Sequence, residues 1–266
     1  MSNESAPNEI GLAMDELKAA ATFLTRLRPG LFGRDSAKAP DFRQGARVFP
    51  VVGALVGVAG GIVLIIATAI GIASPIAAAL AVATTVLITG ALHEDGLADT
   101  ADSFGGSTTE KRLEIMDDSR VGAYGAIALV FSILLRVLAI AAIADNSGAT
   151  RAALVLIAAE AVSRAAMVRL WHDLPAARMG GLAAETGPPD QNAMLIALAI
   201  AAVIAIVVAL PSIGLWPTIF AGALAAIATF AMIRVAAQTL GGRTGDSLGA
   251  TQQLAAIAFL IGASVV

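Results

Sequence analysis

The chain has 266 residues, of which 58% are hydrophobic and only 14% are charged, and its mean hydropathy is +0.82. Soluble domains carry about 25% charged residues, so this composition excludes an ordinary soluble domain. Cysteine is absent, which excludes disulfides and thiolate metal sites. The net charge of −3 gives no reason to expect a nucleic-acid partner.

The first 47 residues are polar and mixed in charge, and we expect them to form a cytoplasmic N-terminal segment. Apolar positions such as Ile10, Leu17 and Leu24 alternate with charged ones over residues 10–27. This pattern predicts an amphipathic helix that lies along the bilayer surface or packs under a bundle.

Residues 48–92, 193–233 and 247–266 contain no charge. Because a helix needs about 20 apolar residues to cross a bilayer, the sequence predicts an all-α, polytopic transmembrane helical bundle, with residues 48–266 as its transmembrane domain. About seven spans fit, at 49–72, 76–92, 121–144, 150–171, 192–210, 217–236 and 250–266.

Lysine and arginine predict the orientation, because cytoplasmic flanks are enriched in them. With the N-terminus inside, segments 1–47, 93–120, 172–191 and 237–249 and the adjoining helix ends hold fifteen of the seventeen basic residues. We therefore expect a multi-pass protein of the cytoplasmic (inner) membrane, in contact with membrane lipid, whose polar segments face the cytoplasm.

Eight of the twenty acidic residues lie between positions 94 and 118. On a helix, Asp95, Asp99 and Asp102 would share one face, because their spacing is i, i+4, i+7. Like charges on one face repel unless a cation lies between them, and Mg²⁺ is commonly held by carboxylates together with substrate phosphates. The pattern predicts a Mg²⁺–diphosphate site, and a solvated acidic surface helix is the alternative.

Three neighbours extend this prediction. Glu94 is a candidate for an additional or outer-shell metal ligand. His93 is a candidate for orienting a carboxylate or acting as a base, although a lone histidine at a membrane interface is more often satisfied locally. Gly96 would keep the acidic face open for a bulky ligand.

A second polar segment precedes the third predicted span. Arg120 could clamp a phosphate, because a guanidinium matches two phosphate oxygens, or it could simply anchor the span. Asp117 and Asp118 could form a second metal position or accept a proton from an attacking hydroxyl, and Asp118 is our candidate general base.

A third segment, residues 240–250, is a glycine-rich turn before the last predicted span. Gly242, Gly245 and Thr244 could cradle a phosphate with backbone N–H groups and a hydroxyl. Asp246 could bind metal or cap the final helix. Within the predicted spans, Arg136, Glu160 and Arg164 require partners, and either an ion-pair cluster or a substrate contact would provide them.

Taken together, these segments resemble the cobalamin synthase family, adenosylcobinamide-GDP ribazoletransferase. The strings that carry the resemblance cover most of the chain; they are residues 23–27, 49–53, 93–102, 113–116, 118–120, Gly122, Tyr124, Gly125, Ser163, Arg164 and 241–250.

The resemblance implies a Mg²⁺-dependent membrane transferase that completes cobalamin (vitamin B12) biosynthesis. Such an enzyme moves the phospho-cobinamide part of adenosylcobinamide-GDP to α-ribazole or its 5′-phosphate and releases GMP. Its substrates, a corrinoid nucleotide and a ribazole, would then meet the predicted metal ligands Glu94, Asp95, Asp99, Asp102 and Asp246. Ser163 and Arg164 would join Arg120 and the glycine-rich turn in binding substrate.

Two other functions remain open from the residues. The spacing Asp-Gly-x-Ala-Asp-x-x-Asp also resembles CDP-alcohol phosphotransferases and intramembrane prenyltransferases, which use Mg²⁺-bound diphosphates. A cation-coupled transporter could line its path with carboxylates, although transporters place such sites near the bilayer midplane and often show repeated halves.

Overall fold

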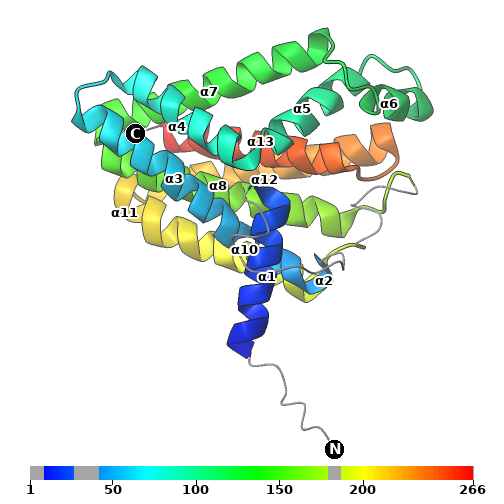
Figure 1. The fold of residues 1–266 in the computed structure, drawn as a ribbon, viewed down its shortest axis with the longest axis horizontal. Coiled ribbons are helices and arrows are strands. Elements are labelled where there is room, and N and C mark those ends of the chain that lie inside the picture. Colours follow the sequence, from blue (N-terminus) through cyan, green and yellow to red (C-terminus); the bar gives the residue numbers. More distant parts are fainter. Residues whose placement is uncertain (1–8, 27–41, 179–186, 266) are drawn as a thin grey trace, which may run out of the picture.

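The computed structural model describes residues 9–26, 42–178 and 187–265, and in these ranges the chain forms helices and no strand. Figure 1 shows them packed side by side as a bundle. The helices are α1 (Glu9–Leu24), α2 (Phe42–Gly45), η2 (Ala46–Val48), α3 (Phe49–Ala69), α4 (Ser74–Thr89), α5 (Leu92–Ser103), α6 (Thr109–Met116), α7 (Ala123–Ser147), α8 (Ala149–Asp173), α10 (Gln191–Ile204), η3 (Ala205–Ala209), α11 (Leu210–Ile213), α12 (Leu215–Val235), η4 (Ala236–Leu240) and α13 (Gly245–Ala263). The predicted all-α class is confirmed.

Each predicted span coincides with a helix, and the membrane character of the bundle is confirmed. Four helical stretches are long and apolar enough to cross a membrane, namely Phe42–Ala69, Ala123–Ser147, Gln191–Ile213 and Leu215–Leu240. A fifth passes if α4 and α5, which meet at a bend of 90°, count as one span. The number seven stays a prediction.

Helix α8 forms the centre of the bundle and contacts α3, α7, α10, α12 and α13. Most of its residues are buried, although it carries Glu160 and Arg164. Large apolar side chains on the outer helices instead remain exposed, among them Ile66, Phe131, Val207 and Phe230. This distribution suits a lipid-facing exterior around a tightly packed interior.

Glycines of α3 allow its backbone to touch α8. A Cβ added at Gly53 would lie 2.2 Å from the Glu160 carbonyl oxygen, and one at Gly57 would lie 2.7 Å from Cα of Ile157. The two helices can therefore approach this closely only where no side chain intervenes.

We expect Gly57→Ala to lower stability by about 1–3 kcal/mol, because the added methyl group must push α3 away from α8. The matched control is Gly222→Ala in α12, where a Cβ would meet nothing within 4 Å and alanine favours the helix. Thermal unfolding of the two purified variants in the same detergent measures the difference, and equal melting temperatures would contradict this account of the helix contact.

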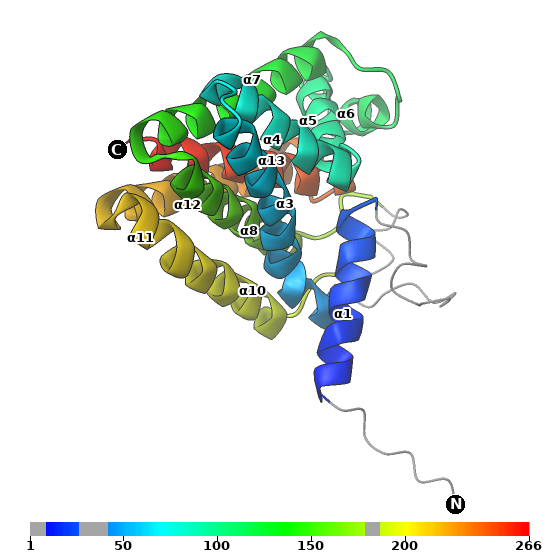
Figure 2. The same ribbon diagram turned by 60° about the vertical axis from the view of Figure 1, so that its left-hand side comes forward.

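The predicted N-terminal amphipathic helix is present as α1. It contacts α3, and Ala20 and Leu24 in its second half are buried, while Leu12 near its start is 46% exposed. Glu16 accepts hydrogen bonds from the guanidinium of Arg47, at 2.9 and 3.0 Å. Figure 2 shows α1 beside the lower end of α3. Residues 1–8 and 27–41 of the predicted N-terminal segment lie outside the described residues.

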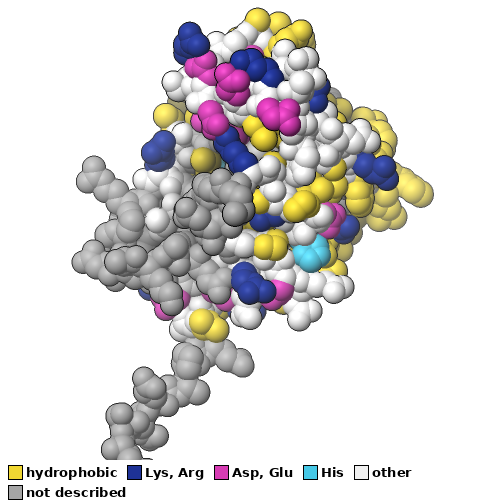
Figure 3. Space-filling view, turned by 90° about the vertical axis from the view of Figure 1, so that its right-hand side faces the viewer, with side chains coloured by type: hydrophobic (Ala, Val, Ile, Leu, Met, Phe, Trp, Pro, Cys, Tyr) yellow, Lys and Arg dark blue, Asp and Glu magenta, His cyan; other side chains and the backbone are white. Residues whose placement is uncertain are grey.

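The described parts of the four predicted polar segments gather at one end of the bundle. Helix α5 contacts α6 and the start of α13, α6 contacts η4, and Ala176 bridges to Arg243. Figure 3 looks onto this end and shows acidic and basic side chains gathered on its upper part. The polar segments therefore share one side, as the distribution of basic residues predicted.

Candidate active site

The acidic helix α5 begins at a sharp corner after α4. Gly90 ends α4 with φ 65°, and Ala91 continues the turn with φ 57°, the left-handed conformation that an alanine seldom adopts. The turn leads α5 away from α4 at 90°. Asp95, Asp99 and Asp102 then lie on a common side of a single helix, as their spacing predicted.

Helix α13 brings a fourth carboxylate to this side. A Cβ at Gly96 would lie 2.7 Å from the Asp246 carbonyl oxygen, and one at Gly249 would lie 3.2 Å from Cα of His93. The backbones of α5 and α13 thus touch, and Asp246 comes beside the α5 aspartates. Gly96 serves this helix contact, which corrects the expectation that it keeps space open for a ligand.

The charges of these aspartates act on one another. Partial burial, followed by the charges of Asp246, Asp95 and Asp102, raises the pKa of Asp99 from 3.8 to about 7. Burial also raises the pKa of Asp246, and Asp95 and Asp117 add to this, while its own backbone amide and Arg178 oppose it. The site therefore carries negative charge that a cation would relieve.

The aspartates do not converge on one point. Among the residues that the structure describes, no three histidine or carboxylate side chains lie close enough together to hold a metal ion. Asp102 instead accepts hydrogen bonds from the amides of Gly122 and Gly125, at 2.7 and 2.9 Å. Asp102 thus stabilises the start of α7, a role that sequence spacing did not predict.

The glycine-rich turn forms a rigid start to α13. Gly241 has φ 74°, and a Cβ at Gly242 would lie 2.5 Å from the Pro175 carbonyl oxygen. Thr244 caps α13 and exchanges hydrogen bonds with Ser247, at 2.9 and 3.1 Å. Gly245 is the first residue of α13, where backbone amides are not used within a helix. The predicted phosphate cradle therefore adjoins Asp246.

Glu94 lies inside the bundle, where it contacts other helices, and its role as a metal ligand stays a prediction. It is 6% exposed, and its Oε1 accepts hydrogen bonds from Arg136 of α7 and Gln253 of α13, both at 3.0 Å. Gln253 in turn accepts from Ser132 at 2.9 Å. Glu94 thus serves the interior, because adjacent positions on an α-helix point about 100° apart and position 94 is turned toward α7 and α13.

The interior network continues to α8. Gln253 donates to Gln252 at 2.9 Å, and Gln252 donates to Ser163 at 3.0 Å. Arg164 pairs with Glu160 one turn before it, so each of these two buried charges has a partner. Ser163 and Arg164 are almost fully buried, so in this structure they hold helices together and do not reach the acidic face.

His93 is also interior, because it is 2% exposed and its Nε2 has no hydrogen-bond partner among the described residues. A base needs access to the proton it removes, so burial does not favour a catalytic role for His93, and that role stays a prediction.

Asp118 and Arg120 form a separate exposed pair. Arg120 donates to Asp118 through Nε at 3.0 Å and Nη2 at 2.6 Å. These hydrogen bonds lower the pKa of Asp118 to about 2. A carboxylate this acidic is a poor general base near neutral pH while it is paired with Arg120, and the role of Asp118 as the base stays a prediction. Arg120 is 86% exposed.

Two features of this end of the bundle were missed by sequence reasoning. Arg178, which follows α8, forms an ion pair with Asp117, which follows α6; nothing in the spacing of these residues indicated the contact. Gln252 and Gln253 join the interior network, and here a signal existed, because adjacent amides in an uncharged apolar run require buried partners.

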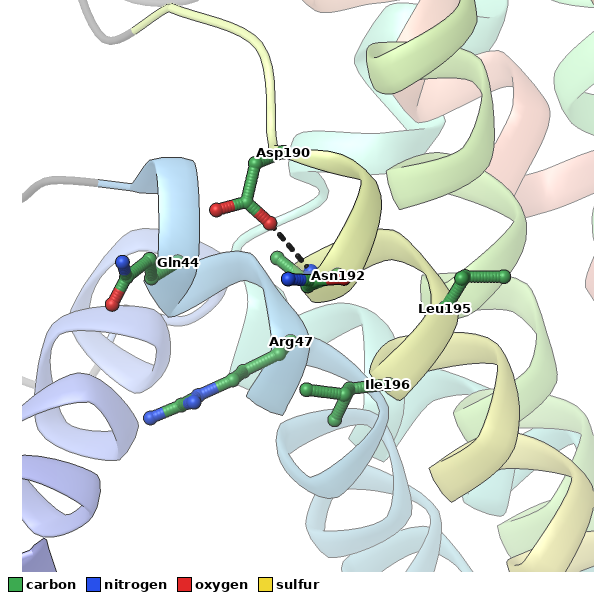
Figure 4. A pocket seen from close by; sticks show the side chains of 7 residues that line it. Gln44, Arg47, Asp190, Asn192, Leu195 and Ile196 are labelled. Atoms are coloured by element: carbon green, nitrogen blue, oxygen red, sulfur yellow. Dashed lines mark hydrogen bonds between the residues drawn. The ribbon is translucent and has the colours of Figure 1, made fainter.

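A hollow of about 350 Å³ lies elsewhere, between η2 and the start of α10. Figure 4 shows it lined by Gln44, Arg47, Asp190, Asn192, Leu195 and Ile196, with Asp190 capping α10 through the Ala193 amide at 2.7 Å. None of the predicted site residues lines it, so we place the candidate active site at the acidic face and not in this hollow.

Known proteins resemble this chain over nearly its whole length. The family model described as cobalamin-5-phosphate synthase matches residues 16–264. A protein of Azorhizobium caulinodans named adenosylcobinamide-GDP ribazoletransferase is 47% identical over 93% of this chain and 94% of its own length. Proteins of the same name from Rhizobium etli and Brucella melitensis are 43% and 40% identical over 93% and 95% of this chain and 95% and 96% of their own lengths. No solved structure shows a significant match.

Proposed function

The chain belongs to the cobalamin-5-phosphate synthase family and is a transferase of cobalamin synthesis that acts on a corrinoid, and from this premise we propose its substrates, its metal and its site. The reaction moves the phospho-cobinamide part of adenosylcobinamide-GDP to a hydroxyl of α-ribazole or of its 5′-phosphate. A new phosphoester bond forms, the diphosphate bond breaks, and GMP leaves. The comparisons do not favour the other diphosphate transferases or the transporter.

The observation that supports this site best is the meeting of two segments about 150 positions apart. The aspartates of α5 and the turn that begins α13 are both strings on which the family resemblance rests, and the contact at Gly96 brings Asp246 beside Asp99. A diphosphate needs both positive charge and N–H donors around it, and this junction offers places for both.

We propose that Asp95, Asp99 and Asp246 hold Mg²⁺, with Asp102 fixing α7 beside them. Carboxylate oxygens are the ligands that Mg²⁺ prefers, and partial burial together with the charges of Asp246, Asp95 and Asp102 raises the pKa of Asp99. When bound, Mg²⁺ would neutralise charge on the diphosphate and on the departing GMP. The three aspartate side chains must move closer together to bind the ion. Their mutual repulsion opposes this movement until the cation is present.

The chain's own residues position the substrate. The Gly245 amide at the start of α13 can donate to a phosphate oxygen, since helix N-termini favour anions. The cap formed by Thr244 and Ser247 holds this turn in place. Because catalysis of phosphoryl transfer depends mostly on positioning and charge stabilisation, a rigid turn facing a carboxylate cluster suits this reaction.

We also propose that this end of the bundle faces the cytoplasm from the inner membrane. Support comes from the basic residues on the same side, such as Arg112, Arg169 and Arg178, since cytoplasmic flanks are enriched in them. Exposed apolar side chains of α3, α7, α10 and α12 would contact lipid.

Incubation of the purified full chain with adenosylcobinamide-GDP, α-ribazole and Mg²⁺ tests the proposal. We expect equal amounts of GMP and a new corrinoid, and neither product after chelation of the metal. A parallel reaction with α-ribazole 5′-phosphate identifies the better acceptor. Absence of GMP with both acceptors would contradict the proposed reaction.

A further inference from the structure

Arg178 lies in a short segment that is fixed against the glycine-rich turn. The Arg243 amide donates to the Pro175 carbonyl at 2.8 Å, and the Ala177 amide donates to the Arg243 carbonyl at 2.9 Å. The absence of a side chain at Gly242 allows this contact. The segment after α8 and the turn before α13 therefore form one unit, which places Arg178 at the entrance of α13.

Arg178 also joins the segment after α8 to the acidic end of the bundle. It pairs with Asp117, which directly follows α6, and α6 contacts the acidic helix α5. Its side chain is 36% exposed and that of Asp117 is 61% exposed. A solvent-exposed ion pair contributes little free energy, so another anion can replace Asp117 at low cost.

Arg120, the arginine predicted to clamp a phosphate, is placed differently. It is paired within its own segment, with Asp118 two residues away, whereas Arg178 joins the segment after α8 to Asp117 after α6. Arg243 of the turn is 4% exposed and donates to the Leu174 carbonyl, so its role is to hold the turn.

We infer that Arg178, and not Arg120, binds the diphosphate of the nucleotide-activated corrinoid, and that Asp117 occupies Arg178 until this substrate arrives. The inference rests on the proposed function, because it assigns a substrate group to the same site. A guanidinium offers two parallel N–H donors that match two phosphate oxygens. The more highly charged diphosphate competes effectively with a single exposed carboxylate.

Equilibrium binding of adenosylcobinamide-GDP with Mg²⁺, in the absence of acceptor, tests the assignment in the full-length protein. We expect Arg178→Gln to weaken binding about 10- to 100-fold, the range for a lost charged hydrogen bond, and Arg178→Lys to recover part of it. Arg169→Gln is the matched control, since Arg169 is also paired with an aspartate at this end of the bundle, at 2.7 Å, and it should bind normally.

Asp117→Asn separates a substrate contact from a structural ion pair. If Asp117 only occupies Arg178, its removal leaves binding unchanged or tightens it by up to about fivefold. Weaker binding by Asp117→Asn, or a loss in Arg120→Gln without one in Arg178→Gln, would overturn the inference. Wild-type protein that binds this nucleotide without releasing GMP when α-ribazole is added would overturn the proposed reaction but leave Arg178 assigned. Wild-type protein that binds no such nucleotide would overturn both.

Discussion

Asp99→Asn should lower the rate of GMP release by about 100-fold or more at saturating Mg²⁺, because loss of one preorganised electrostatic group typically costs 10²–10³ in turnover. Asp99 is the aspartate on which the charges of Asp95, Asp102 and Asp246 act, after partial burial, to raise its pKa. The isosteric amide removes the charge that would hold the cation while keeping the shape of the side chain.

The matched control is Glu114→Gln on α6, an exposed carboxylate paired with Lys111 at 2.9 Å. It makes the same chemical change at the same end of the bundle and should retain wild-type turnover. Initial rates of both variants over a Mg²⁺ titration provide the comparison. A near-native rate for Asp99→Asn would remove this residue from the proposed metal site.

The pKa of Asp99 adds a pH dependence with a definite sign. Because the folded value is raised from 3.8 to about 7, the stabilising contribution of this group is present below pH 3.8 and is lost as pH rises through 7. Metal-free protein should therefore melt at lower temperature at pH 8 than at pH 5, and Mg²⁺ should restore more stability at pH 8. Asp99→Asn should reduce both the pH dependence of the melting temperature and the extra stabilisation by Mg²⁺ at pH 8. If neither quantity changes in this variant, other groups are responsible for them.

Most of the bundle could be predicted from sequence, because the length of an apolar run alone indicates whether a helix can cross a bilayer. The run that predicted residues 49–72 became α3, Phe49–Ala69, and the run at 217–236 became α12, Leu215–Val235. The polar segment 93–120 was less predictable. The direction of its first helix, α5, depends on the left-handed conformation of Ala91. Alanine seldom adopts this conformation, so the sequence does not indicate it.

The candidate site was predictable only where its residues share one helix. The spacing of Asp95, Asp99 and Asp102 placed them on one face, since helix periodicity is a local property. The approach of Asp246 depends on contact between Gly96 and the first turn of α13, and the pairing of Arg178 with Asp117 depends on how two loops meet. Such contacts are products of tertiary packing, for which one sequence gives no spacing rule.

We expect the second large effect, a loss of stability, when the interior ion pair between Glu94 and Arg136 is broken. Both side chains are less than 8% exposed, and Gln253 binds the same carboxylate oxygen. Removing one member of a buried ion pair leaves the other uncompensated and costs about 3–5 kcal/mol. Glu94→Gln should therefore lower thermal stability strongly, and Glu114→Gln should lower it by no more than about 1 kcal/mol.

The Mg²⁺ dependence of the same variant then decides what Glu94 does. As an interior contact between α5, α7 and α13, Glu94 holds Asp95 in place without touching the cation, so the Mg²⁺ concentration for half-maximal activity should stay near the wild-type value in the surviving folded protein. As a metal ligand, its loss would raise that concentration at least about tenfold. Replacement of both Glu94 and Arg136 by methionine should recover most of the lost stability, because no charge is then left buried. If the double replacement lowers stability by the sum of the two single replacements, the two side chains are not coupled. Another contact would then have to hold α5 in the bundle.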